Sequence, residues 1–234
     1  MSLLKSIKNG IRLNYPVEYD GKIVLLEDIL EKAVEELLKR AKAGESIVPE
    51  PHNVLRALSY IKYPSVVIIG QDPYPDKNLA TGIAFGVPKG SKIPTSLRII
   101  FRELAKEYPN ADLKEGLETL EHWATQEVLL LNTALTVAEG KPGSHFEIWS
   151  EFVKQLVKVI SDSAVNNDFK PIVFVLLGKQ AKNLIRPVIN EKIHYVIERH
   201  HPAAEAYGGK NKFEGFYKEV NELLKQTNQE IQWL

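Results

Sequence analysis

The sequence has no cysteine, no excess of either charge and no long apolar run. Without Cys, the 234 residues offer no disulfide, no thiolate metal site and no thiol nucleophile, which fits a reducing cytoplasm. Lys plus Arg and Asp plus Glu both number 30, so any basic surface for nucleic acid must be local. No apolar run approaches the roughly 20 residues of a membrane span, and the N-terminus lacks a signal-like core. We therefore expect a soluble, cytoplasmic protein that does not contact membranes.

The motifs of several common active sites are also missing. No glycine-rich phosphate fingerprint follows any apolar run, and Gly82, Gly86 and Gly90 have the wrong spacing for one. The neighbouring side chains of His200 and His201 would diverge, which makes them a poor chelating pair. No G-x-S-x-G elbow is present for a serine nucleophile. We expect neither a cofactor nor a metal.

Four short apolar runs predict the strands of one sheet. They lie at residues 66–69, 128–131, 172–177 and, more weakly, 195–197. The first consists of β-branched residues without alternation, which is typical of a parallel strand covered on both faces. The pattern therefore predicts a central four-stranded, mostly parallel sheet.

Amphipathic segments between the runs predict helices that cover this sheet. Apolar residues recur at helical spacing in residues 24–43, 96–107, 147–163, 179–189 and 213–225. Strands that alternate with such helices indicate an α/β fold with three layers, α/β/α. No Ser/Gly-rich linker divides the chain, so we expect one domain over residues 1–234. For residues 1–46 we expect a helical N-terminal cap.

Polar residues follow the predicted strands at the point where each strand ends. Asp72 follows the first run, Asn132 the second, a turn with Gly178 the third and His201 the fourth. Ligands of open α/β sheets bind outside the carboxyl ends of the strands, so these residues are candidates for one site. Each also has a purely structural interpretation, since Asp before Pro forms turns, Asn caps them and a His before Pro occurs in surface loops.

Several ordered motifs also resemble family 1 uracil-DNA glycosylases. Gly70-Gln71-Asp72-Pro73-Tyr74 is similar to the water-activating motif of that family, and Gly82-Ile83-Ala84-Phe85 to its base-stacking segment. The segment 129–137, which contains Asn132, resembles the uracil-reading segment, and Ser144-His145 and His201-Pro202 follow in the expected order. The resemblance covers residue 47 to the end and implies a uracil-DNA glycosylase-like fold.

The resemblance implies a division of roles in catalysis. Breaking the N-glycosidic bond develops positive charge on the sugar and negative charge on the departing uracil. Asp72 would orient water and stabilise the sugar cation, and His201 would donate a hydrogen bond to O2 of the base. Gln71 would assist through its backbone.

It also implies how the base is recognised. The Asn132 amide has both a donor and an acceptor, so it would bind O4 and N3–H of uracil and reject cytosine. Phe85 would stack on the extruded base, and Tyr74 would exclude the methyl group of thymine.

The DNA-contacting segments depart from the family. Pro75 replaces a histidine, and the final loop has Ala203 and Glu205 but no leucine wedge. We expect Lys179 to make a charged contact with a DNA phosphate. We also expect that the space left by the extruded base is filled less well than in the family, or by another residue. The candidates for DNA binding are Pro94, Ser96, Gly178, Lys179, Ala203, Tyr207 and Lys210.

The resemblance also implies the partners of the protein, and two other functions compete with uracil excision. The partner would be uracil-containing DNA, either single- or double-stranded, and the protein would bind it as a monomer. A proteinaceous glycosylase inhibitor is a further candidate ligand. A weakened uracil-DNA-binding or scaffold relative is the main alternative, and a flavodoxin-like small-molecule binder is the second.

Overall fold

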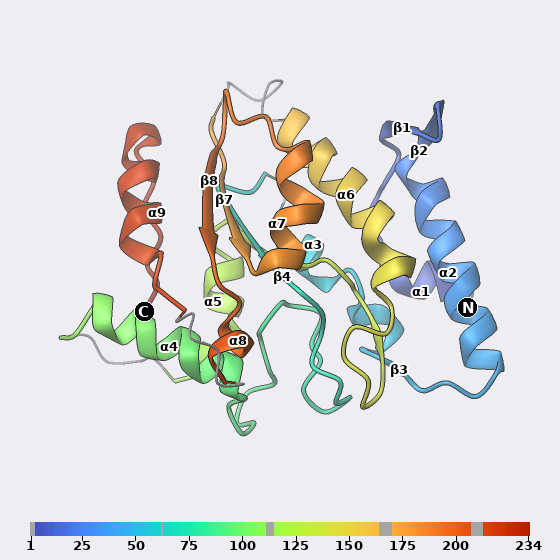
Figure 1. Ribbon diagram of the computed structural model, residues 1–234, viewed down its shortest axis with the longest axis horizontal. Coiled ribbons are helices and arrows are strands. Elements are labelled where there is room, and N and C mark those ends of the chain that lie inside the picture. The colour runs from blue at the N-terminus through green and yellow to red at the C-terminus, as the bar shows by residue number, and fades with distance from the viewer. Residues whose placement is uncertain (1–2, 62, 111–114, 164–169, 207–212) are drawn as a thin grey trace.

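The central sheet contains four parallel strands in the order β5-β4-β7-β8. A computed structural model describes residues 3–61, 63–110, 115–163, 170–206 and 213–234. The strands of this sheet are β4 (Val66–Gly70), β5 (Val128–Asn132), β7 (Val173–Leu177) and β8 (Tyr195–Arg199). All four coincide with the apolar runs that predicted them. The β8 arrow in Figure 1 points to the end of the sheet where short helix α8 (Pro202–Ala206) lies.

Alternate residues of the buried strands face two different hydrophobic clusters. In β4, Val67 and Ile69 pack into one cluster, whereas Val66 and Ile68 pack into the other. Figure 1 shows helices on both sides of the sheet, with α2 (Leu26–Lys42) and α6 (Phe146–Ser163) on one side and α4 (Thr95–Glu107) and α9 (Tyr217–Leu224) on the other. Because both faces are covered, the strands are apolar throughout, as parallel strands require. The predicted three-layer α/β/α fold is confirmed.

The five helices predicted by range are present and differ from the prediction only at their ends, whereas three short helices, α3 (Arg56–Ser59), α5 (Glu121–Ala124) and α8, were not predicted. The α-helices are α1 (Leu3–Lys8), α2 (Leu26–Lys42), α3 (Arg56–Ser59), α4 (Thr95–Glu107), α5 (Glu121–Ala124), α6 (Phe146–Ser163), α7 (Lys179–Ile185), α8 and α9 (Tyr217–Leu224). The 3-10 helices are η1 (Pro51–Asn53), η2 (Leu117–Thr119), η4 (Arg186–Val188) and η5 (Lys225–Thr227).

Helices α7 and α9 differ most from the predicted ranges, for identifiable reasons. Helix α7 ends at Ile185, and 3-10 helix η4 takes over because Pro187 restricts the residue before it and cannot donate a helical hydrogen bond. Helix α9 begins only at Tyr217, because Phe213 and Phe216 are buried in an aromatic cluster before the helix starts.

The N-terminal segment is not a purely helical cap, so that expectation is wrong in part. Strands β1 (Pro16–Tyr19) and β2 (Lys22–Leu25) form an antiparallel hairpin before helix α2. Its two-residue turn is Asp20-Gly21, and both residues have positive φ, of 51° and 68°. An Asp-Gly pair with this conformation is a strong hairpin signal. A second short pair, β3 (Ile47–Val48) with β6 (Val137–Ala138), joins the segment after α2 to the part of the chain that follows β5.

Helices long and apolar enough to cross a membrane are absent from the part of the chain that the structure describes.

The side chain of Asn221 holds the C-terminal residues against the core. Its Nδ2 donates to the carbonyl oxygen of Ile231 at 3.0 Å, and its Oδ1 accepts from the N–H of Ile231 at 3.0 Å. Trp123 Nε1 adds a bond of 2.8 Å to the carbonyl oxygen of Trp233. These buried backbone groups depend on side chains because they lie outside any strand.

We expect Asn221→Ala to lower the free energy of unfolding by about 1–3 kcal/mol, because two buried backbone groups lose their partners. Urea unfolding monitored by tryptophan fluorescence measures the change. The control is Lys225→Ala, which removes an exposed ion pair with Glu222 and should change stability by less than about 0.5 kcal/mol. Equal stability of the two variants would contradict this role of Asn221.

Candidate active site

Four predicted site residues lie at the same end of the sheet. Asn132 is the last residue of β5 and pairs in register with Gly70, the last residue of β4. Asp72 follows β4 by two residues, and His201 follows β8 by two residues. Gly178 follows β7 directly, and a Cβ at this position would lie 2.8 Å from the Cβ of His201. The parallel register therefore gathers these residues at the carboxyl edge.

A narrow cavity at this edge is lined by three of the residues predicted to bind the base. Tyr74, Phe85 and Asn132 form its wall together with apolar residues that include Leu131 and Leu135. Asn132 is only 8% exposed, so its amide lies in an otherwise apolar surrounding. Asp72, Gln71 and His201 are not part of this wall, but the ring of His201 lies 5.6 Å from that of Phe85. In this form the cavity has a volume of about 10 Å³, room for about one water molecule, and it presents one amide to that space.

Glycine at position 70 is required by the packing of this cavity. A Cβ on Gly70 would lie 2.5 Å from Oδ1 of Asn132 and 2.9 Å from the ring of Phe85. Both distances are shorter than real Cβ contacts. The missing side chain allows the amide and the ring to approach the end of β4.

The loop that carries Phe85 is held from several directions. Phe85 itself has a positive φ of 66°. Its carbonyl oxygen accepts a hydrogen bond from the Tyr74 hydroxyl at 3.2 Å. The N–H of Ala84 donates to the carbonyl oxygen of Leu130 in β5 at 3.1 Å. Burial raises the pKa of Tyr74, so this hydroxyl stays protonated and keeps its donor role.

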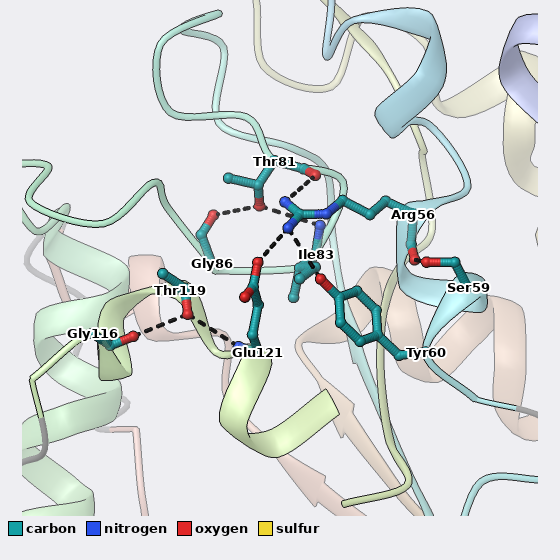
Figure 2. A network of polar contacts seen from close by, with 9 residues as sticks. All are labelled: Arg56, Ser59, Tyr60, Thr81, Ile83, Gly86, Gly116, Thr119 and Glu121. Atoms are coloured by element: carbon teal, nitrogen blue, oxygen red, sulfur yellow. Dashed lines mark hydrogen bonds and ion pairs between the residues drawn. The ribbon is translucent and has the colours of Figure 1, made fainter. Parts of the chain in front are cut away.

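Arg56 and Thr81 support the same loop from behind, as Figure 2 shows. The Thr81 hydroxyl donates to the carbonyl oxygen of Gly86 at 3.1 Å and accepts from the N–H of Ile83 at 3.3 Å. The guanidinium of Arg56 binds the carbonyl oxygen of Thr81 at 3.4 Å and forms an ion pair with Glu121. The sequence analysis missed Arg56 and Thr81, because no pattern marks a residue that acts on a loop through backbone atoms.

Asp72 is half-buried and bound on one side by a backbone donor. Its Oδ2 accepts a hydrogen bond of 2.5 Å from the N–H of Gly143. Burial raises the pKa of Asp72 above its ordinary value, and the Gly143 N–H partly opposes this. Oδ1 has no hydrogen-bond partner within the described part of the chain, so it remains available to a water molecule. The sequence analysis missed Gly143, since a backbone donor carries no signal in the side-chain pattern.

Gln71 is fixed through its backbone. Its carbonyl oxygen accepts bonds from the Thr133 hydroxyl at 2.7 Å and from the N–H of Ala134 at 2.9 Å. These bonds attach the segment after β4 to the segment after β5. They hold the backbone on both sides of Gln71 in one orientation relative to Asn132.

His201 is held as a neutral ring with a defined tautomer. Burial lowers its pKa to about 4. The N–H of Ala203 donates to His201 Nδ1 at 3.1 Å. Because Nδ1 accepts, the proton of the neutral ring is on Nε2. The side chain is therefore a neutral hydrogen-bond donor at neutral pH.

The residues predicted to contact DNA lie around this edge where the structure describes them. Pro94 precedes helix α4 and Ser96 lies in its first turn. Lys179 is exposed at the start of α7, after Gly178, whose φ is 93°. Ala203 lies in α8. Tyr207 and Lys210 lie outside the described residues.

Glu205, which lies in the final segment that lacks a leucine, has a structural role. Its two carboxylate oxygens bind the guanidinium of Arg102 in α4 at 2.7 and 2.8 Å. One of them also accepts from the N–H of Phe213 at 3.1 Å. These contacts lower the pKa of Glu205 to about 2. Glu205 therefore fastens α8 to α4.

Metal-binding clusters of three or more acidic or histidine side chains are not found in the described ranges. The site thus consists of a partly buried carboxylate, a neutral histidine donor and a narrow pocket with one amide and one aromatic ring. Within an α/β fold, this combination defines a class of protein that binds a planar heterocycle and acts on a bond beside it.

Comparisons with known proteins identify the family. The model of the "Uracil DNA glycosylase superfamily" matches residues 60–225. The uracil-DNA glycosylase of Borreliella burgdorferi (strain ZS7) is 36% identical over 231 residues, which cover 92% of this chain and 96% of the relative. The chain therefore belongs to the uracil DNA glycosylase superfamily.

Solved structures agree with this assignment. The crystal structure of mimivirus uracil-DNA glycosylase aligns with a TM-score of 0.75 and 26% identity over 87% of this chain and 80% of that one. A mimivirus UNG variant in complex with UGI aligns with a TM-score of 0.74 and 26% identity, over 88% and 82% of the two chains.

We expect stability to decrease as the pH falls from 7 to 4.5. Burial lowers the pKa values of His145, His194 and His201 in the folded protein. The unfolded chain therefore binds more protons below about pH 6.5, and acid favours it. For His201, whose folded pKa is about 4, the loss at pH 4.5 is on the order of 2 kcal/mol.

Urea midpoints measured between pH 7 and 4.5 test this prediction. His201→Asn should flatten the pH dependence, whereas His52→Asn, at an exposed position, should leave it as in the parent protein. Identical profiles for all three proteins would contradict the burial argument.

Proposed function

We propose that this chain removes uracil from DNA by hydrolysing the N-glycosidic bond, which leaves free uracil and an abasic site. The observation that carries the proposal is that a neutral donor, His201, and a partly buried carboxylate, Asp72, follow strand ends at the same edge of the sheet as the pocket that contains Asn132. Bond cleavage leaves negative charge on the base and positive charge on the sugar, so a donor and an anion are needed on opposite sides of the bond.

His201 stabilises the departing base. The Nε2–H donates to O2 of uracil as negative charge develops there. Because the pKa of the ring is about 4, the ring is neutral before the reaction and interacts through a hydrogen bond rather than a full charge. The bond from Ala203 to Nδ1 fixes the ring orientation at no cost during the reaction.

Asp72 acts on the sugar side. Oδ2 is occupied by Gly143, so Oδ1 orients the attacking water. The raised pKa makes the carboxylate a better proton acceptor, and its negative charge stabilises the sugar cation. Gln71 contributes backbone groups at the same turn.

The pocket selects uracil. Asn132 donates to O4 and accepts from N3–H, a pattern that cytosine reverses. Phe85 stacks on the base. Tyr74, which is anchored to the carbonyl oxygen of Phe85, occupies the space beside C5 and excludes the methyl group of thymine.

DNA is held by residues around the edge of the sheet. Lys179 supplies a charge, while Pro94, Ser96, Gly178 and Ala203 supply close backbone approach. Tyr207 and Lys210 are the candidates to fill the space of the extruded base. Without a leucine wedge, we expect excision from single strands to be favoured over excision from duplexes.

The proposal also covers the oligomeric state, the protein partner and the cellular location. Residues 1–234 act as one domain and as a monomer, since the base pocket is formed within one chain. A protein ligand of the UGI kind is a further partner, supported by the complex of the mimivirus relative. The setting is the cytoplasm, because the curated relative is bacterial and the substrate is DNA.

We expect Asp72→Asn to reduce excision by about 10²- to 10⁴-fold, the usual contribution of a positioned base. The assay uses matched oligonucleotides with one uracil, either single-stranded or paired with guanine or adenine, followed by alkaline cleavage. Asp76→Asn, which changes an exposed carboxylate four residues away, is the matched control and should retain activity.

Three outcomes of this assay are informative. Binding of uracil-DNA without release of base by the parent protein would favour the scaffold alternative. Full activity of Asp72→Asn would contradict the role of Asp72. A clear preference for duplex substrate would contradict the expected weak wedge.

We expect Lys179→Ala to weaken DNA binding several-fold at low salt and to reduce the slope of log K against log salt by about 1. The loss should not depend on sequence, because a phosphate contact carries no base information. Lys158→Ala, on the exposed side of α6, is the control with an unchanged slope. Equal slopes for both variants would remove Lys179 from the DNA interface.

A further inference from the structure

The loop after β6 provides two backbone donors to the segment that contains Asp72. The N–H of Gly143 binds Asp72, and the N–H of Gly140 donates to the carbonyl oxygen of Pro75 at 2.7 Å. The loop is closed on itself, since the N–H of Ala138 donates to the Ser144 hydroxyl at 2.8 Å. Both glycines have positive φ, so the loop conformation depends on them. The position of the Gly143 N–H thus follows from the position of the whole loop.

His145 anchors the end of this loop. Its side chain is fully buried, two residues after Gly143. Trp149 Nε1 donates to the Thr136 hydroxyl at 2.7 Å, and this hydroxyl lies 2.8 Å from His145 Nδ1. Nε2 lies 2.9 Å from Oε1 of the Glu45 carboxylate, which can only accept, so in the neutral ring Nδ1 is the acceptor and the Thr136 hydroxyl donates to it. The proton of the neutral ring is therefore on Nε2.

The second ring nitrogen binds Glu45, which comes from a distant part of the chain. His145 Nε2 lies 2.9 Å from Glu45 Oε1. Burial is the main influence on His145 and lowers its pKa, while Glu45 raises it and Arg40 lowers it further. Glu45 lies outside residues 60–225, the part that matches the family model.

The neighbour of Glu45 reinforces the same attachment. The Ser46 hydroxyl donates to Glu139 Oε2 at 2.7 Å, and the N–H of Glu139 donates to the carbonyl oxygen of Ser46 at 2.8 Å. Strand β3 follows at once and pairs with β6. The segment after α2 therefore contacts the loop at its start, through Ser46 and Glu139, and at its end, through Glu45 and His145.

We propose that Glu45 and His145 are positioning residues for catalysis, which hold the Gly143 N–H against Asp72. This inference rests on the proposed function of Asp72. Neither residue touches the base pocket, so both act through the loop. The N-terminal segment, for which the sequence suggested only a cap, thus contributes to the alignment of the water-orienting carboxylate.

The experiment compares Glu45→Ala with Glu45→Gln, which keeps an oxygen that accepts from His145 Nε2–H. Kinetics are measured on a single-stranded uracil oligonucleotide as a function of pH. We expect Glu45→Ala to lower kcat about tenfold and to change KM by less than about twofold, because the substrate contacts remain. Glu45→Gln should stay within about twofold of the parent protein.

The acidic limb of the pH–rate profile reports the pKa of Asp72. It therefore distinguishes a loss of the Gly143 contact from a general loss of stability. The Gly143 N–H lowers the pKa of Asp72, so weakening this contact raises that pKa. The limb should move to higher pH in Glu45→Ala and stay in place in Glu45→Gln. Carboxyl ¹³C titration of Asp72 reports the same shift without turnover.

Two controls account for effects on folding. Glu191→Ala removes an exposed ion pair with Arg186 far from the site. His194→Gln is matched to His145→Gln, because His194 is also buried and bound at both ring nitrogens, by the N–H of Ile172 and the carbonyl oxygen of Ser161. We expect both His variants to lose stability, but only His145→Gln to change kcat and the acidic limb.

The results distinguish this inference from the proposed function. An active parent protein whose kcat and Asp72 titration are unchanged by Glu45→Ala would overturn the positioning role alone. A parent protein that releases no uracil would overturn the proposed function, while the Asp72 titration in Glu45→Ala would still decide whether the loop is held through Glu45.

Discussion

The base pocket depends on the missing side chain of Gly70. This residue ends the central strand β4 and pairs in register with Asn132 of β5, which holds its backbone beside the Asn132 amide. A methyl group would overlap with the Asn132 amide and the Phe85 ring. The contacts of Thr81 and Tyr74 then hold the Phe85 loop against this surface. If Asn132 and Phe85 bind the base as proposed, its recognition depends on how closely the end of β4 lets these two side chains approach.

Exclusion of water has opposite effects on the two groups proposed to catalyse the reaction. It lowers the pKa of His201, which keeps the ring neutral, and it raises the pKa of Asp72, which makes the carboxylate more basic. One backbone N–H binds each group, from Ala203 to His201 and from Gly143 to Asp72, and the Gly143 N–H partly opposes the rise in the pKa of Asp72. The two opposite pKa shifts therefore have burial as their common main cause.

The sequence predicted the sheet and its edge well, because continuous β-branched runs and the polar residues after them reflect burial on both faces. It placed Asp72, Asn132 and His201 at one edge for that reason. It failed where backbone atoms carry the interaction, as at Gly143, and where distant segments meet, as for Arg56 with Thr81. The hairpin at Asp20 was missed although its turn dipeptide is diagnostic. Long-range contacts of this kind have no local pattern.

The bidentate contact between Glu205 and Arg102 has a thermodynamic consequence for DNA binding. It docks α8 on α4 in the DNA-free protein, together with the adjoining His201. The conformational entropy of this segment is therefore lost when the chain folds rather than when it meets its substrate. A segment that is already ordered subtracts nothing further from the binding free energy. If α8 contacts DNA as proposed, this preorganisation offsets part of the binding free energy that a leucine wedge would contribute.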